Sequence, residues 1–195
     1  MIYQAIDRWN TPYFEHYGVK GMKWGVRRYQ HKDGTRIKRT LFVSGSSKTQ
    51  FRDSGYYRKQ LPKQIKERLN TAMEEQVDIV VGDAPGVDRQ VQNYLNKKGY
   101  SKVTVYGPGT KVRYSANKDW KTKPIDAPEF EPGSKEWLAK KDIEMERVST
   151  EGLAIILDEG SKATKKNVER LLANNKNVSV YELSRYGKKK DRFIR

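Results

Sequence analysis

The amino-acid sequence predicts an α/β fold: a Rossmann-like, doubly wound parallel sheet of about five strands with helices on both faces. One observation is that apolar runs of five or six residues alternate along the chain with segments of helical spacing. Such runs are typical of parallel strands that are buried on both faces. Another is the length of 195 residues, which fits one domain with extensions better than two full domains. Right-handed crossovers between successive strands then give the doubly wound arrangement.

In the first half of the domain, short apolar runs predict strands at residues 40–44, 77–81 and 102–106. Between the first two runs, residues 56–75 carry apolar side chains three or four positions apart, which predicts a helix. Pro62 is tolerated only in the first turn of that helix. Residues 87–97 have the same spacing and predict a shorter helix that Gly99 closes.

In the second half, Ser134 is expected to cap a helix that runs to about residue 149. Its candidate core positions are Leu138, Ile143, Met145 and Val148. An apolar run at residues 153–157 predicts the fourth strand, and residues 178–183 predict the last. The intervening helix, residues 162–174, is indicated by the spacing of Val168, Leu171 and Leu172.

The chain is expected to have three parts. Residues 1–38 form a basic, aromatic-rich N-terminal extension, residues 39–184 form the domain, and residues 185–195 form a basic C-terminal tail. Within the domain, residues 107–134 are expected to be an inserted loop, because they hold four of the seven prolines. A loop of this length inside a compact domain is usually functional or disordered.

The formal net charge of +16 suggests nucleic-acid binding until its distribution is considered. Residues 1–40 carry a net +6 and residues 185–195 a net +5, which leaves only +5 for the 144 residues between them. The excess charge therefore belongs mainly to the two ends. Nucleic acid is a secondary prediction that concerns the ends and not the domain.

The composition excludes several kinds of site. The chain has no cysteine, which excludes disulfides, thiolate zinc sites and cysteine nucleophiles. Its two histidines, His16 and His31, both lie near the N-terminus, which argues against a histidine metal cluster or a Ser-His-Asp triad. We therefore expect no metal and no cofactor. No stretch approaches the roughly 18 to 20 apolar residues of a membrane span, so no membrane association is expected.

The predicted ligand site consists of the loops after the first, second and fourth strands, because ligands of doubly wound sheets bind at the carboxyl ends of the strands. These loops are small and polar, and the second and third begin helices, where free N–H groups favour an anion. Neither GxxxxGK[ST] nor a GxGxxG after the first strand is present. The expected ligand-binding residues are Ser44, Gly45, Ser46, Ser47, Lys48, Gly82, Asp83, Ala84, Gly86, Asp88, Asp158, Gly160, Ser161, Lys162 and Thr164.

Several of these residues have a second interpretation. Lys48 either contacts phosphate or is solvated, and Asp88 either binds a ribose hydroxyl or complements the helix dipole. Asp158 and Glu159 could form an acid/base pair, although polar turn residues are the favoured interpretation. In the inserted loop, two aromatic residues either stack on a base as a lid or cover the domain surface: Tyr114 and Trp120.

Three segments resemble the SLOG superfamily. The segment VVGDAPGVDRQVQNYL, residues 80–95, resembles its GGARGxD-type segment, and LFVSGSS, residues 41–47, resembles its opening strand and phosphate loop. Residues 140–183 resemble its later part, in which a charged helix with a Met leads to a strand and a G-x-x-x-T turn. The resemblance implies a Rossmann-like domain that binds nucleotides or nucleotide-derived metabolites. Relatives include cytokinin-activating phosphoribohydrolases and a DNA-processing protein, and they often form homodimers.

The resemblance also implies roles for single residues. Those with a phosphate-facing role are Gly45, Ser46 and Ser47. The matches to the GGxxGxD loop are Gly82, Gly86 and Asp88, and those to the last turn are Gly160, Ser161 and Thr164. Asp83 replaces the second Gly of the GGxxGxD loop, so its carboxylate lies beside the anion site or accepts from a ribose hydroxyl or base. Asn167 stands where the phosphoribohydrolases carry their catalytic Glu, which disfavours that hydrolase activity.

A further motif lies in the N-terminal extension. HYGVKGMKWGVRR, residues 16–28, resembles a short motif that recurs in proteins of tailed phages and prophages of Gram-positive bacteria, often beside head-associated proteins. This resemblance implies phage origin and a packaging or partner-binding tag.

Three functions are compatible with these observations. The leading hypothesis is a phage-encoded binding protein that acts in the cytoplasm of the bacterial host and sequesters a nucleotide or nucleotide-derived signal of host defence. The second is a nucleotide-processing hydrolase that cleaves an N-glycosidic or phosphate bond. The third is a DNA-binding or virion-associated protein that uses residues 1–38 and 185–195, for which counterion release predicts strong salt dependence.

Overall fold

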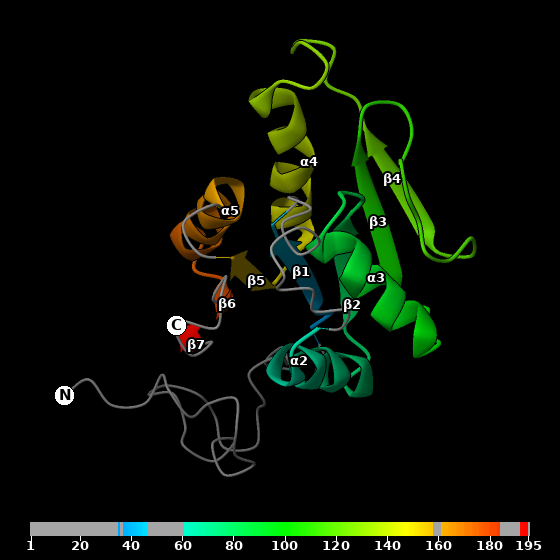
Figure 1. Ribbon diagram of the computed structural model, residues 1–195, viewed down its shortest axis with the longest axis vertical. Helices are drawn as coiled ribbons and strands as arrows, with labels where there is room; N and C mark the ends of the chain where they lie inside the picture. The colour runs from blue at the N-terminus through cyan, green and yellow to red at the C-terminus, as the bar shows by residue number, and fades with distance from the viewer. Residues whose placement is uncertain (1–34, 36, 47–60, 158–160, 184–191, 195) are drawn as a thin grey trace, which may run out of the picture.

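The computed structural model of the protein describes residues 35, 37–46, 61–157, 161–183 and 192–194, and it has an α/β fold with one sheet and four helices (Figure 1). Six parallel strands follow the order β4-β3-β2-β1-β5-β6, and β7 pairs antiparallel with β6. The strands are β1 (Thr40–Gly45), β2 (Asp78–Gly82), β3 (Val103–Pro108), β4 (Lys121–Ile125), β5 (Glu151–Leu157), β6 (Asn177–Leu183) and β7 (Arg192–Ile194). The helices are α2 (Lys63–Glu74), α3 (Val87–Lys97), α4 (Lys135–Val148) and α5 (Lys162–Ala173).

The strand order reverses beside β1. The chain runs outward from β1 through β2 and β3 to β4, and α4 then leads back to β5 on the other side of β1. The connections after β1 and β5 therefore leave the sheet in opposite directions. This is the position at which doubly wound sheets bind their ligands.

Both ends of the strand order differ from the sequence-based prediction. Residues 121–125, which were expected in the inserted loop, pair in parallel with β3, from Thr104 opposite Lys121 to Pro108 opposite Ile125. This segment lacks an apolar run because β4 is an edge strand whose residues are exposed or half-buried. Residues 192–194, which were expected in the solvated C-terminal tail, form β7 beside β6.

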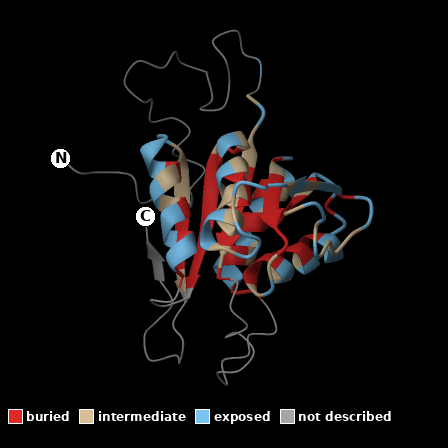
Figure 2. Ribbon diagram, turned by 90° about the horizontal axis from the view of Figure 1, so that it is seen from above, coloured by how far each residue is buried: buried red, intermediate tan, exposed pale blue. Residues whose placement is uncertain are grey.

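The core has two parts, because alternate residues of each strand face opposite sides of the sheet. On one side, Leu41 and Val43 of β1 belong to a cluster that includes the apolar faces of α2 and α3. On the other side, Phe42 packs in a smaller cluster with Met145 of α4 and Leu171 of α5. Figure 2 shows the buried strands between helices whose outer faces are exposed.

Helix α4 begins as predicted, since the Ser134 Oγ accepts a hydrogen bond of 3.1 Å from the backbone N–H of Trp137. Its predicted core was wrong at Ile143, which is 41% exposed, whereas Met145 is 1% exposed. Lys141 is buried on the same helix. The face that α4 turns to the sheet is therefore partly charged. On α5, Leu171 is buried, whereas Leu172 is exposed.

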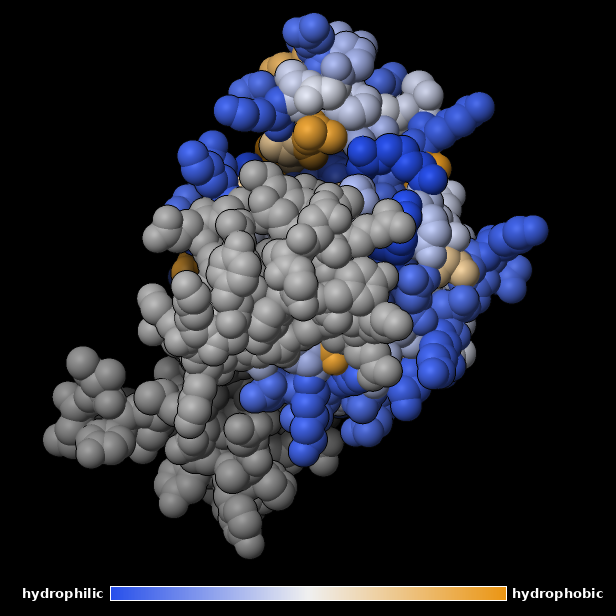
Figure 3. Space-filling view, in the orientation of Figure 1, coloured by the Kyte–Doolittle hydropathy of each residue, from blue (hydrophilic) through white to orange (hydrophobic). Residues whose placement is uncertain are grey.

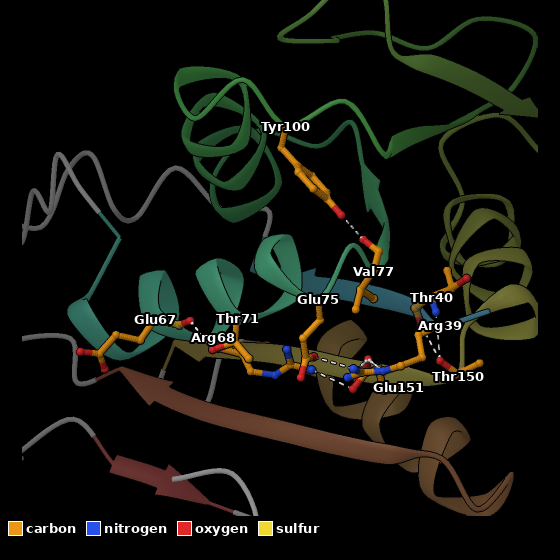
Figure 4. A network of polar contacts seen from close by, with 10 residues as sticks. All are labelled: Arg39, Thr40, Glu67, Arg68, Thr71, Glu75, Val77, Tyr100, Thr150 and Glu151. Carbon is orange, nitrogen blue, oxygen red and sulfur yellow. Dashed lines mark hydrogen bonds and ion pairs between the residues drawn. The ribbon is translucent and has the colours of Figure 1, made fainter. Parts of the chain in front are cut away.

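At the amino ends of the strands, a buried ion-pair network joins three parts of the chain (Figure 4). The Glu151 carboxylate at the start of β5 accepts from Arg39 Nη2 and from Arg68 Nη2 of α2, each at 2.8 Å. Arg39 also pairs with Glu75, which follows α2, at 2.5 Å. The side chain of Glu151 is 1% exposed, so this network closes the end of the sheet opposite to the carboxyl edge.

The surface of the described residues is mainly hydrophilic on the face in Figure 3, where apolar side chains form only small spots. Within the described ranges, none of the helices combines the length and the apolar character required to cross a membrane.

Candidate functional site

Polar side chains from four elements meet at the carboxyl ends of β1 and β2, on the side of the sheet that α4 and α5 cover. Asn167 of α5 donates from Nδ2 to the Ser44 Oγ at 2.9 Å and to the Asp142 Oδ2 at 3.1 Å. Asp142 forms an ion pair with its neighbour Lys141 on α4. Asp88 reaches this group from the first turn of α3, and its Oδ2 accepts from the backbone N–H of Ala84 at 3.3 Å. These residues form one polar cluster, in which Ser44, Asp88, Lys141 and Asn167 are buried.

Gly82, the last residue of β2, explains how close these side chains come. A Cβ at this position would collide with the Asp88 Oδ2 and lie 3.1 Å from the Lys141 Nζ. Glycine is therefore required here because the two charged groups occupy the space that a side chain would fill. The structure thus brings two of the predicted site residues, Gly82 and Asp88, close together.

The pKa values of the cluster reflect its burial. Burial raises the pKa of Asp88 to about 7, and the carboxylates of Asp142 and Asp83 act in the same direction, against the Lys141 ammonium and the Ala84 N–H. Burial alone would lower the pKa of Lys141, but the surrounding carboxylates, above all Asp142 and Asp88, outweigh it and raise the pKa. Lys141 therefore stays charged near neutral pH, whereas Asp88 exchanges its proton there.

A pH dependence of stability follows from Asp88. Its pKa in the folded state is about 7, against 3.8 for an ordinary aspartate, so the folded state binds the proton more tightly. The stabilisation from Asp88 is therefore complete below about pH 4 and is lost as the pH rises through 7. Between pH 4.5 and 7.5, Asp88 should lower the free energy of unfolding of the wild type by on the order of 3 kcal/mol, and Asp88→Asn should abolish this decrease. Urea unfolding at the two pH values measures it.

Asp119→Asn is the matched control for this experiment, because it makes the same substitution at an exposed aspartate. It should leave the pH dependence of the wild type unchanged. A steep fall of stability between pH 4.5 and 7.5 that persists in Asp88→Asn would contradict the assignment.

The loop after β2 holds the inserted segment in place through Asp83. Its side chain is fully buried, and the Oδ2 accepts from the backbone N–H of Arg113 at 2.8 Å and from the Nε of Arg113 at 3.0 Å. Its Oδ1 accepts from Arg113 Nη2 at 2.5 Å. Both oxygens of Asp83 accept from Arg113 in this arrangement, and the prediction that Asp83 accepts from a ribose hydroxyl or base stays a prediction.

The loop after β1 packs directly on the start of α3. A Cβ on Gly45 would collide with the side chain of Val87, and the Ser46 carbonyl accepts from the Val87 N–H at 3.1 Å. Gly86 precedes Val87 with a φ of 92°, a conformation that favours glycine. Small residues are thus needed here for close packing of backbone, in agreement with their predicted place in one site.

The remaining predicted residues fall into two groups. Ser161 is the N-cap of α5 and is buried, as is Thr164, whereas Lys162 is exposed. The other four lie outside the described residues: Ser47, Lys48, Asp158 and Gly160. The motif at residues 16–28 also lies outside them.

The two aromatic residues of the proposed lid have different positions. Trp120 is 4% exposed, belongs to the core on the α2/α3 side, and donates from its indole to the Tyr100 carbonyl at 2.9 Å. Its assignment to a lid or to the surface is therefore wrong. Tyr114 is half-buried on the outer face of α3, with its ring 4.4 Å from the Arg89 guanidinium carbon and its hydroxyl donating to Asn93.

Three residues of the site were missed by the sequence-based prediction: Lys141 and Asp142 of the cluster, and Arg113, which pairs with Asp83. For Lys141 a signal exists, because it lies three residues after Leu138 and four before Met145, on the face of α4 that was expected to be apolar. A charged residue on such a face needs a buried partner. Arg113 has no comparable signal, since its partner is 30 residues away.

One comparison with known proteins gives a match. A family described as a family of unknown function (DUF7211) matches residues 12–31, a segment that includes the motif at residues 16–28 and lies outside the domain. No curated protein matches the chain.

Proposed function

We propose that the protein binds a nucleotide or a nucleotide-derived small molecule at the carboxyl edge of β1, β2 and β5. The observation that supports this most is the polar cluster itself, which brings together Ser44, Asp88 and Asp142 beside the point of strand-order reversal. Buried polar groups are usually retained where they specify a structure or a site. Doubly wound sheets bind nucleotides at this position.

The resemblance of residues 39–184 to the SLOG superfamily supports the same ligand class. The matched residues Gly45, Gly82 and Gly86 all lie where a side chain would collide or the backbone needs a positive φ. They bring the loops after β1 and β2 together at the start of α3, whose N-terminal end favours an anion.

Binding without turnover is favoured by the contacts of Asn167. Its Nδ2 donates to Ser44 and Asp142, and its Oδ1 accepts from Arg170 Nη1 at 2.6 Å. The amide therefore uses both of its hydrogens and its oxygen within the protein. At the position of the phosphoribohydrolases' catalytic Glu, this side chain joins strands and helices and supplies no acid.

The specific form of the proposal is that a phage-encoded protein captures a nucleotide signal of host defence. It depends on the resemblance of residues 16–28 to phage motifs and on the expected ligand class. Mass spectrometry of small molecules retained by the protein purified from a bacterial host tests it, because a sequestering protein should release its ligand intact on denaturation. Release of cleaved fragments would contradict sequestration and favour the hydrolase.

A variant of Asp142 tests the site. Asp142→Asn removes the negative charge that neutralises Lys141 and should strengthen the binding of an anionic nucleotide by about tenfold, because the carboxylate no longer opposes the phosphate and the Lys141 ammonium is no longer neutralised. Isothermal titration with a panel of ribonucleotides measures the change. Glu144→Gln is the matched control, since Glu144 lies two residues later on α4 and pairs with Arg147 on the surface. Equal affinities in the two variants would place the site elsewhere.

A further inference from the structure

The inserted segment between β3 and β4 contributes an arginine to the candidate site. Arg113 lies beside Asp83, the residue directly after β2, and the same Asp83 Oδ2 is 2.7 Å from the place of a Cβ on Gly107 in β3. Arg113 therefore crosses the carboxyl ends of β2 and β3. Its charge belongs to the same electrostatic group as the polar cluster, since Asp83 and Asp88 both act to raise its pKa.

The guanidinium of Arg113 is fixed on one edge and open on the other. Nε and Nη2 donate to the two oxygens of Asp83, and the backbone N–H of Arg113 donates to the same carboxylate. Among the hydrogen bonds of the described residues, none uses the Nη1. The side chain is 47% exposed although its partner is fully buried.

A guanidinium held in this way suits anion binding. A free arginine loses rotamer freedom when it binds a ligand, whereas one held by a buried carboxylate has already lost it in the folded protein. Arginine also presents parallel N–H donors, which match the oxygens of a phosphate. The pairing with Asp83 neutralises the overall charge of the pair but leaves the outward donors of the guanidinium available.

We propose that Arg113 is a ligand-binding residue and that its exposed edge holds a phosphate group of the ligand. This inference rests on the proposed function and adds two points to it: the ligand carries a phosphate, and the inserted segment takes part in its recognition. Asp83 is then a positioning residue, because it is fully buried and orients Arg113.

The experiment compares a nucleoside with its nucleotide, for example adenosine with AMP and ADP, by isothermal titration with the full chain and with variants. Arg113→Ala alone would leave the buried Asp83 carboxylate without its ion pair and would destabilise the fold. The informative variant is therefore the double substitution Asp83→Asn with Arg113→Ala, which removes both charges. Lys111→Ala is the matched control, because Lys111 is exposed in the same segment and carries the same charge.

The wild type should bind the nucleotide more tightly than the nucleoside. The double variant should lose about 10- to 100-fold in affinity for the nucleotide and keep its affinity for the nucleoside. Asp83→Asn alone should give an intermediate loss, since the arginine remains but is less well oriented. Lys111→Ala should match the wild type.

Two other outcomes separate the inference from the proposed function. If the wild type binds nucleotides and the double variant keeps the preference for the phosphorylated ligand, the role of Arg113 is wrong and the proposed function stands. If the wild type binds no nucleotide from a panel of the four ribonucleotides and their cyclic and dinucleotide forms, both are overturned.

Discussion

Replacing Glu151 with Ala should lower the free energy of unfolding by about 3–5 kcal/mol, because it removes the shared partner of two arginines. Arg39 Nε and Nη2 both donate to the Glu151 Oε1, at 3.1 and 2.8 Å, and Arg68 Nη2 donates to the Oε2. The side chain of Arg68 is 8% exposed. Loss of the carboxylate therefore leaves a buried positive charge at the amino end of β5, with a second one close by. Urea denaturation, with a check that the m-value is unchanged, measures the effect.

The control is Glu75→Ala, which removes another carboxylate that pairs with Arg39. The side chain of Glu75 is 46% exposed, so the expected loss is below about 1 kcal/mol. Equal losses in the two variants would contradict this expectation, because they would show that the buried ion pairs of Glu151 stabilise the fold no more than a surface ion pair does. If Glu151→Ala fails to fold, the isosteric Glu151→Gln keeps the comparison measurable, because its amide oxygen still accepts from one arginine.

Trp120→Ala should lower the free energy of unfolding by about 3–5 kcal/mol as well, for a different reason. The indole fills the core on the α2/α3 side at the far end of α3, and it provides the donor for the buried carbonyl of Tyr100. Removal of this side chain leaves a cavity and an unsatisfied acceptor together. Thermal unfolding of the variant measures the loss. It is monitored by the circular dichroism of the backbone, which does not depend on the tryptophan that is removed.

Tyr114→Ala is the natural comparison, because both aromatic residues belong to the inserted segment and were predicted alike, either to form a lid or to cover the domain surface. Tyr114 is half-buried and contacts the exposed Arg89 and Asn93 on the outer face of α3, so its removal should reduce stability by about 1 kcal/mol or less. If Trp120→Ala were as mild as Tyr114→Ala, the indole could not be part of the core.

The fold was largely predictable from the sequence because the inner strands are buried on both faces and are therefore mainly apolar. The five runs that begin near residues 40, 77, 102, 153 and 178 all became strands. The segment KTKPI at residues 121–125 was missed for the opposite reason, since an edge strand needs no apolar run. Helix α3 was predicted at residues 87–97 and occupies those residues, because turn residues bound it on both sides.

The position of the candidate site was predictable from the sequence, whereas the residues that complete it were less so. The loops after β1 and β2 follow from the fold class, whereas their partners come from distant parts of the chain. Asn167 bonds to Ser44 across 123 residues, and Arg113 bonds to Asp83 across 30. Helical or strand periodicity relates only residues within the same element, so it cannot predict which residues of distant segments will pair. Lys141 was the exception, as a charge on a face that should have been apolar.

The edge strand β4 also limits how copies of the protein can join. The Ile125 carbonyl accepts from the Gly109 N–H, so alternate residues of β4 direct their backbone groups toward β3, and Thr122 and Pro124 direct theirs outward. Proline has no N–H, which leaves Thr122 as the one outward backbone donor within β4. Two further residues of the strand are lysines, which repel a second copy. Sheet extension by strand addition is therefore disfavoured at this edge of the sheet.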